Sequence, residues 1–315
     1  LIERLRTPDT TFVIHVCKNS SRKYLKEIRY LQRDQNDVFF CKRESGIHFY
    51  FGLVKGILNA LKLLFDKKIE FDYVNLISGQ DYPIKPNSEI KEFFKQNKGK
   101  EFLLYWPLFP KDGSNFCTDH PWGAHRQLYR IDRYHLKFCG KMHSIPELLT
   151  GRLINHSFME TLKIFIFESP KYLREKRWIE EFLLFVFSRI LPKKRKIPAN
   201  IEFYGGKTWW SITRECAEYI VKYSRQHPKF DRFFKHTLIP DEMYFQTLIM
   251  NSPFKEKVDN NYLREIEWTG GDGTHPIIFT KYNFEHLMNS KALFARKFDV
   301  NTDEEILDMV DGIIK

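Results

Sequence analysis

Short apolar segments alternate with helical patterns along the first third of the chain. Two helical patterns stand out, the apolar run YFGLVKGILNALKLLF and the shorter IKEFFKQ, after a basic helix expected from about Ser21. Four segments have the length and composition of buried strands, at residues 11–16, 37–40, 73–78 and 101–106. This alternation is typical of βαβ units, so it predicts an α/β fold with a mostly parallel central sheet and helices on both faces.

The stretch SGQDYP begins at Ser78, where the third of these strands ends. In open α/β sheets, ligands bind in the crevice outside the carboxyl ends of the strands. Ser, Gly, Asp and Pro are also the usual residues of turns, so a plain surface turn is the alternative interpretation. The position therefore marks a candidate ligand loop.

The charge of the chain indicates anionic partners but does not select among them. The 315 residues carry a formal net charge of +11, and the pI is near 9.2, which favours nucleotide diphosphates, acidic lipid or nucleic acid. The basic residues are distributed and no common nucleic-acid recognition signature is present, so we expect no nucleic-acid partner. The segment 177–198 joins an apolar helical pattern to PKKRK. It predicts either a peripheral contact with an anionic membrane or a core helix followed by a solvated loop.

The five cysteines are scattered, without a CxxC pair or a Cys/His cluster at zinc-ligand spacing. We interpret them as reduced thiols that pack as small hydrophobic residues. No apolar run approaches the ~18 residues that a membrane-spanning helix needs. The chain starts at Leu1, inside what reads as the end of a helix, so we expect a segment upstream of it.

Two neighbouring carboxylates, Asp241 and Glu242, follow Pro240 at the expected first turn of an apolar-striped helix. Carboxylates in this position interact favourably with the helix dipole, so they are explained equally well as capping residues. A carboxylate on a rigid helix start also suits a general base, provided that a substrate hydroxyl reaches it. Both interpretations stay open at this point.

Arg296 and Lys297 lie between two phenylalanines near the C-terminus, a setting that suits a phosphate ligand. The Gly-rich loop EWTGGDGTHP matches neither GxxxxGK[ST] nor GxGxxG, and no DxD triplet occurs in the chain. A sugar-nucleotide transferase that uses a divalent cation would present neighbouring carboxylates to hold it. If this chain is such an enzyme, cationic side chains must replace the metal, and we expect no cofactor.

Six stretches occur along the chain in an order that is typical of one enzyme family. They are FVIHVCKNS, NLISGQDYPIK, YGGKTWWSITRE, IPDEMYFQTL, EWTGGDGTHP and LFARKFD. Between about residues 11 and 300 they resemble the core-2/I-branching β-1,6-N-acetylglucosaminyltransferases (glycosyltransferase family 14) and the related peptide O-xylosyltransferases. The resemblance implies a GT-A-like fold, a UDP-sugar donor, inversion at the anomeric carbon and no metal. It also implies a single catalytic domain over 1–315, with a nucleotide-binding half at 1–106 and an acceptor-binding and catalytic half at 107–315. The first strand of the nucleotide-binding half would lie upstream of Leu1.

By this resemblance Glu242 is the general base, and Arg296 and Lys297 bind the donor diphosphate. The branching enzymes bring a further arginine to the diphosphate from the Gly-rich loop, and the aligned position here is Thr274. This departure leaves more of the charge neutralisation to the basic pair.

The nucleoside pocket of the family aligns with His15, Cys17, His48, Gly79 and Asp81. Cys17 stands where the family usually has an aspartate near the uracil, and His48 stands where an aromatic residue is expected. Gly79 would permit a close backbone approach. Asp81 would order the loop or contact the donor.

The acceptor cleft of the family is lined by aromatic residues that align with Trp209 and Trp268. Aromatic faces stack on the C–H faces of sugar rings, although a lone tryptophan is more often a core residue. Arg126, Arg130 and Arg133 lie in the variable region that shapes acceptor choice, and we expect one of them to contact the acceptor.

The leading hypothesis is therefore a metal-independent inverting glycosyltransferase that moves N-acetylglucosamine from its UDP form to an oligosaccharide or lipid-linked glycan. UDP-xylose is the alternative donor, and a non-catalytic glycan- or nucleotide-binding relative is the alternative class. The absence of disulfide-like pairing suggests a cytoplasmic bacterial protein at the inner face of the plasma membrane, with the Golgi lumen as the alternative for a eukaryotic one.

Overall fold

The computed structural model describes residues 1–32, 37–46, 50–109, 128–138, 141–145, 195–268 and 275–314, and a few positions between 183 and 191. Its helices are α1 (Ile2–Leu5), α2 (Arg22–Arg29), α3 (Phe51–Asp66), α4 (Asn87–Gln96), α9 (Arg214–Gln226), α10 (Pro228–Phe234), α11 (Tyr244–Met250), α12 (Phe284–Asn289) and α13 (Glu305–Ile314). Short 3-10 turns are η1 (Tyr30–Gln32), η3 (Pro240–Glu242), η4 (Lys255–Lys257) and η5 (Lys281–Asn283).

The largest sheet of the described residues has the strand order β3 (Tyr73–Asn75), β8 (Tyr204–Thr213), β5 (Glu101–Pro107) and β9 (Val258–Asp259). β8 is antiparallel to both of its neighbours, and only β5 and β9 are parallel. The α/β class is confirmed, but the expectation of a mostly parallel central sheet is wrong for this sheet. The reason is that β8, from the second half of the chain, inserts in the opposite direction between two strands of the first half.

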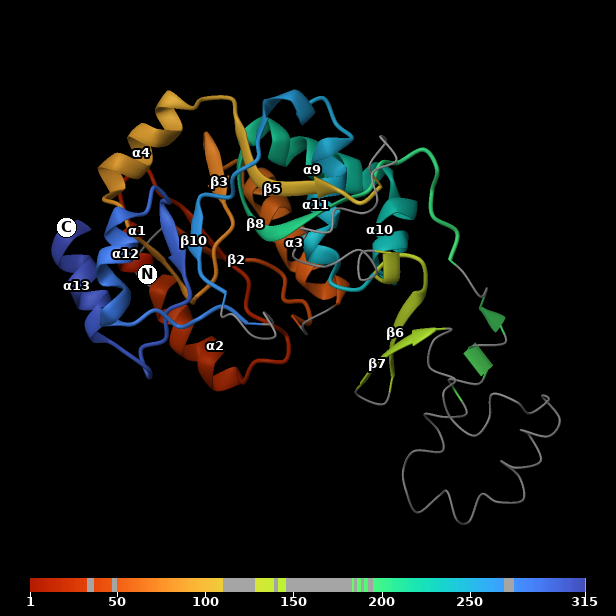
Figure 1. Cartoon of the computed structure of the whole chain (residues 1–315), viewed down its shortest axis with the longest axis horizontal. Helices are drawn as coiled ribbons and strands as arrows, with labels where there is room; N and C mark the ends of the chain where they lie inside the picture. Colours follow the sequence, from red (N-terminus) through yellow and green to blue (C-terminus); the bar gives the residue numbers. More distant parts are fainter. Residues whose placement is uncertain are drawn as a thin grey trace, which may run out of the picture.

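Three smaller sheets complete the strands (Figure 1). β1 (Phe12–Ile14) and β2 (Val38–Phe40) form a parallel pair, as the alternation predicted. β11 (Phe294–Arg296) lies between β10 (Arg264–Ile266), to which it is parallel, and β4 (Asp81–Pro83), to which it is antiparallel. β6 (Tyr134–Phe138) and β7 (Lys141–Ile145) form an antiparallel pair.

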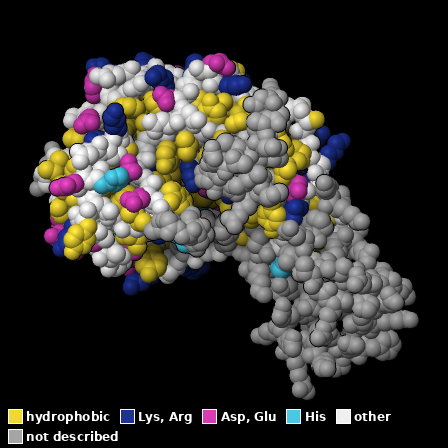
Figure 2. All heavy atoms as spheres, in the orientation of Figure 1, with side chains coloured by type: hydrophobic (Ala, Val, Ile, Leu, Met, Phe, Trp, Pro, Cys, Tyr) yellow, Lys and Arg dark blue, Asp and Glu magenta, His cyan; other side chains and the backbone are white. Residues whose placement is uncertain are grey.

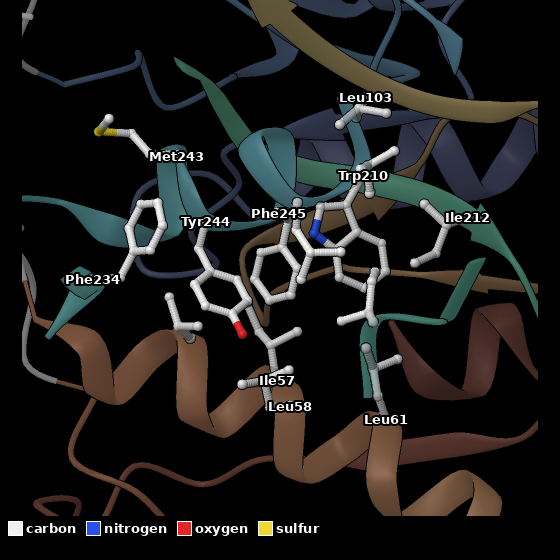
Figure 3. Packing of buried hydrophobic residues seen from close by; sticks show 14 of the residues in the cluster. Ile57, Leu58, Leu61, Leu103, Trp210, Ile212, Phe234, Met243, Tyr244 and Phe245 are labelled. Carbon is white, nitrogen blue, oxygen red and sulfur yellow. The ribbon is translucent and has the colours of Figure 1, made fainter. Parts of the chain in front are cut away.

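Opposite faces of the four-stranded sheet pack against different helices, because neighbouring residues of a strand point to opposite sides. Val74, Leu103 and Trp210 belong to the main core with residues of α3, α9 and α11. Figure 3 shows Trp210, Tyr244 and Phe245 pointing toward Ile57, Leu58 and Leu61 of α3. On the other face, Tyr73 and Phe102 pack with α4 and with residues of the β10–β11 region. The sheet is therefore covered by helices on both faces.

β8 contains a bulge opposite Leu104 of β5. Leu103 pairs with Trp210 and Tyr105 pairs with Gly206, so the single residue Leu104 faces the three residues 207–209. At Gly206 the strands approach so closely that a Cβ would overlap the carbonyl oxygen of Leu104 and lie 2.7 Å from Gln246 Cγ. Only glycine fits this close backbone approach.

The charges on the face in Figure 2 are mixed, with basic and acidic side chains scattered over its described part. Among the described residues, no helix combines the length and the apolar character needed to cross a bilayer. The expected location of the protein and its division into two halves stay predictions.

We predict that Gly206→Ala destabilises the protein by about 3 kcal/mol or more, because the added methyl group forces the backbone of β5 or the buried Gln246 to move. Urea unfolding measures this change. Gly79→Ala is the matched control, since a Cβ at Gly79 meets no atom within 4 Å. Equal stability of the two variants would contradict the close packing at the bulge.

Candidate active site

The bulge in β8 presents three consecutive side chains, Lys207, Thr208 and Trp209. These three are partly exposed, whereas the strand residues on both sides of them are buried. Each has its own partner among the predicted site residues or next to them, as described below. Bulges commonly re-aim side chains beside active sites, so this bulge is the structural base of the candidate site.

Glu242, the predicted general base, is held by Arg130. The Oε2 atom of Glu242 accepts a hydrogen bond from Arg130 Nη1 at 2.9 Å. The two side chains retain only 10% (Arg130) and 18% (Glu242) exposure, so water screens their attraction poorly. The backbone is fixed as well, because the carbonyl oxygen of Arg130 accepts a hydrogen bond from Leu238 N. The structure thus brings the predicted base together with one of the predicted acceptor-binding arginines.

The turn that carries Arg130 is anchored by a buried network. Tyr129 donates its hydroxyl hydrogen to Ser144 Oγ at 2.7 Å, and Ser144 Oγ lies 2.8 Å from His135 Nδ1. His135 Nε2 lies 2.9 Å from the carbonyl oxygen of Tyr129. Burial lowers the pKa of His135 to about 4, so its ring is neutral at pH 7. Arg133 forms an ion pair with Asp132 at 2.7 Å and lies over the Tyr129 ring at 4.3 Å.

Asp241 lies beside Glu242 and connects the 3-10 turn to the bulge. Its Oδ2 atom accepts a hydrogen bond from Thr208 Oγ1 at 2.7 Å. The side chain is buried, and burial together with the charge of Glu242 raises the pKa of Asp241 to about 6. The two carboxylates predicted for the first turn of a helix lie instead in η3, which Met243 separates from α11.

Arg296, one of the predicted diphosphate ligands, is held by Asp81. Arg296 Nη1 donates to Asp81 Oδ1 at 3.0 Å and to Ser78 Oγ at 2.6 Å. Its guanidinium carbon lies 4.6 Å from the centroid of the Trp209 ring. Asp81 Oδ2 accepts a hydrogen bond from Ser78 N at 2.6 Å, so this carboxylate orders the SGQDYP loop. A predicted nucleoside residue, a predicted phosphate residue and a predicted acceptor residue therefore form one cluster.

Two predicted nucleoside residues lie where β1 ends. His15 Nε2 accepts a hydrogen bond from Glu44 N at 2.9 Å, and burial lowers the pKa of His15. Cys17 Sγ accepts a hydrogen bond from Gly46 N at 3.0 Å. Both side chains therefore hold the segment 44–46, which leads toward His48. Their role toward a nucleoside stays a prediction.

Several predicted residues have no described structure or no tested role. His48, Thr274 and Arg126 lie outside the described residues. Lys297 follows Arg296 and is partly exposed. Among the described residues, Cys17, Cys41 and Cys216 are free thiols, as expected. In the same part of the chain, no group of three His, Cys, Asp or Glu side chains could hold a metal ion; metal independence stays a prediction.

The sequence analysis missed Lys207, Thr208 and Gln246. Lys207 Nζ lies 4.1 Å from the centroid of the Trp268 ring. Its carbonyl oxygen accepts a hydrogen bond from Gln246 Nε2 at 2.6 Å, which fixes the backbone of the bulge. The pair Gly205–Gly206 inside a strand pattern was the available signal, because glycines within strands often mark bulges.

We predict that Asp241→Asn changes how stability depends on pH. Since burial raises the pKa of Asp241 from 3.8 to about 6, the folded protein keeps a proton that the unfolded chain loses. This contribution to stability is complete below about pH 4 and is lost as the pH rises through about 6. Asp241→Asn lacks this contribution. The free energy of unfolding of the wild type should therefore fall by about 3 kcal/mol relative to that of the variant between pH 4 and pH 7.

Chemical unfolding at each pH measures this difference. Thr208→Val removes the hydrogen bond that lowers the pKa of Asp241, so it should move the wild-type transition to higher pH. Parallel pH profiles of the wild type and Asp241→Asn would contradict the assignment.

The chain is similar in sequence to known proteins. The model of the Core-2/I-Branching enzyme family matches residues 2–105 and 148–290. Xylosyltransferase 2 of Rattus norvegicus is 24% identical, that of Canis lupus familiaris 31% and that of Homo sapiens 30%, each over 95% of this chain. The chain spans 30% of the length of each of these relatives. Since the family model covers most of the chain, the chain belongs to the Core-2/I-Branching enzyme family.

Proposed function

We propose that the chain transfers a sugar from a UDP-sugar to an acceptor hydroxyl, with inversion and without a metal ion. The observation that carries this proposal is that the turn with Glu242 and the side chain of Arg296 both contact one bulge of β8. Asp241, the neighbour of Glu242, binds Thr208, and Arg296 lies over Trp209. The turn that carries the base for the acceptor and the cation for the leaving group therefore contact adjacent residues of β8.

Glu242 takes the proton of the acceptor hydroxyl in this proposal. Arg130 binds Oε2, while Oε1 accepts no hydrogen bond from any described residue. The carboxylate is thus oriented with one oxygen left for the substrate. As the acceptor oxygen forms its bond to the anomeric carbon, the bond from that carbon to the phosphate oxygen breaks. The electron pair leaves with UDP, and the proton stays on Glu242.

Arg296, with Lys297, neutralises the charge that develops on the departing diphosphate. A guanidinium has five N–H donors, and in this structure Ser78 and Asp81 bind only Nη1. The contacts with Asp81 and Trp209 fix the group in place before the donor arrives. Such preorganised cations stabilise a transition state without having to rearrange during the reaction.

The donor is a UDP-hexosamine or UDP-xylose. The relatives described above are named xylosyltransferases, which supports UDP-xylose over the UDP-N-acetylglucosamine expected first from the sequence. Titration with each donor and with GDP, in the presence of EDTA, separates the two. The acceptor in this proposal is a glycan hydroxyl that reaches Glu242 beside Trp268 and Trp209.

We predict that Glu242→Gln lowers the rate of transfer by about 100-fold or more, because an amide cannot accept the proton. The variant should bind UDP as the wild type does; it removes the charge that Glu242 contributes to the pair with Arg130, but its amide oxygen can still accept the hydrogen bond from Arg130, which limits the loss of stability. Glu218→Gln, on the exposed side of α9, is the matched control and should keep full activity. If Glu242→Gln transfers sugar at nearly the wild-type rate, Glu242 is not the general base. If the wild type itself transfers no sugar, the result favours a non-catalytic glycan- or nucleotide-binding relative.

We predict that Arg296→Gln combined with Asp81→Asn weakens UDP binding by about tenfold or more. The double variant removes the cation without leaving the buried Asp81 carboxylate unpaired, which would destabilise the fold. Asp81→Asn alone keeps the Arg296 charge but loosens the hold on it, so this variant should weaken UDP binding less than the double variant does. Calorimetry in EDTA measures both, and unchanged UDP affinity of the double variant would place the diphosphate elsewhere.

A further inference from the structure

Lys207 differs from Arg130 and Arg296, the two arginines of the site, because no carboxylate of the described residues forms an ion pair with it. Arg130 is paired with Glu242 and Arg296 with Asp81. Lys207 Nζ lies over the Trp268 ring, and no described residue accepts a hydrogen bond from it or forms an ion pair with it. Within the described part of the chain, the ammonium group of Lys207 thus has an aromatic neighbour but no carboxylate in direct contact.

The ammonium group is also partly removed from water. Lys207 is half-buried, and burial lowers its pKa, while the charge of Glu242 opposes that shift. A charge that loses water without gaining a partner costs free energy, which is why buried charges are normally paired. A contact with one aromatic ring offsets only part of this cost. An anionic ligand group at Nζ would offset the rest.

The position of Lys207 assigns that anionic group to the acceptor and not to the donor diphosphate. The charged groups that act on Lys207 are Glu242 and Arg130, the base and its partner. Asp81 and Arg296 are not among the charges that act on Lys207; Arg296 instead lies over Trp209, two residues further along β8, and is paired with Asp81. The hydroxyl that receives the sugar must lie beside Glu242. An anion bound to Lys207 therefore belongs to the molecule that carries this hydroxyl.

Trp268 indicates the kind of molecule. Lys207 lies at its ring, and 38% of the tryptophan surface is still exposed. A sugar ring buries its C–H face on an indole, and a carboxylate on that ring would reach the neighbouring ammonium. We propose that Lys207 and Trp268 form a subsite for an acidic, uronic acid-type sugar of the acceptor. This inference rests on the proposed function, because it takes Glu242 to mark the acceptor side.

Binding of two matched glycosides tests the subsite. Methyl β-D-glucuronide and methyl β-D-glucoside differ only in a carboxylate against a hydroxymethyl group. Ligand-observed NMR titration of the full chain at low ionic strength gives their affinities. The wild type should bind the glucuronide about tenfold more tightly, as expected for a charge-assisted hydrogen bond. Lys207→Met should abolish this preference, and Lys207→Arg should keep it.

Lys222→Met controls for the change in net charge, because Lys222 is exposed on α9; it should keep the preference. The proposal is overturned if the wild type binds both glycosides equally or neither, or if Lys207→Met retains the preference. A Ser-containing peptide with Glu, compared with the same peptide with Gln, provides a second pair of ligands. If Lys207 discriminates between the peptides but not the sugars, the acceptor is an acidic peptide and the sugar subsite is wrong.

Neither glycoside needs to be turned over, so this result does not depend on catalysis. A Lys207-dependent glucuronide preference without any sugar transfer would overturn the proposed function and leave the subsite. Sugar transfer that depends on Glu242, without the glucuronide preference, would support the proposed function and overturn the subsite.

Discussion

The close approach of β5 and β8 at Gly206 is the constraint on which the rest of the site depends. Because no Cβ fits there, Leu104 and the buried Gln246 contact the strand directly. Gln246 then binds the carbonyl oxygen of Lys207 at 2.6 Å and holds the bulge in one conformation. Gln246 lies four residues after Glu242 on the same short segment. A single packing contact therefore fixes the bulge and the predicted base relative to one another.

Glu242 and Arg296, the predicted base and a predicted diphosphate ligand, are each paired with another charged side chain before any substrate binds. A buried ion pair adds little net stability, since desolvation of both groups offsets much of their attraction. The pairs Arg130–Glu242 and Arg296–Asp81 act by positioning, because each pair holds the side chain of a predicted site residue in one orientation. Because the pairs already fix these side chains, a substrate binds without rearranging them. It adds contacts only at hydrogen-bond donors and acceptors that have no partner yet in the described part of the chain. Lys207 has no such pair among the described residues, so it offers a substrate charge an open partner.

Local sequence patterns predicted the strands and helices of the first third well. β1, β2 and β3 lie within the expected segments, α2 begins next to the expected start at Ser21, and β5, α3 and α4 overlap theirs but extend beyond them by one to three residues. The direction of β8 could not be predicted, because periodicity reports which face of a strand is buried and not which strand lies beside it. The Arg130–Glu242 pair joins residues that are 112 positions apart, so no spacing argument could find it. Lys207 was missed because a single lysine in a strand usually marks a solvent-facing position.

Arg264 explains why Arg296 can serve as a fixed cation. This buried guanidinium donates to the carbonyl oxygen of Leu76 at 2.9 Å and to Ser211 Oγ at 3.2 Å, so it joins β10 to the ends of β3 and β8. Burial lowers the pKa of Arg264 to about 10, which leaves it charged at pH 7, and its charge acts on Asp81. Burial raises the pKa of Asp81, while Arg296 and Arg264 oppose that rise. Two cations thus oppose the protonation of one buried carboxylate, and that carboxylate holds Arg296. Without Arg264, the Asp81 anion would depend on the hydrogen bond from Ser78 N and on Arg296, and a diphosphate that drew Arg296 away would leave this anion without a cation beside it among the described residues.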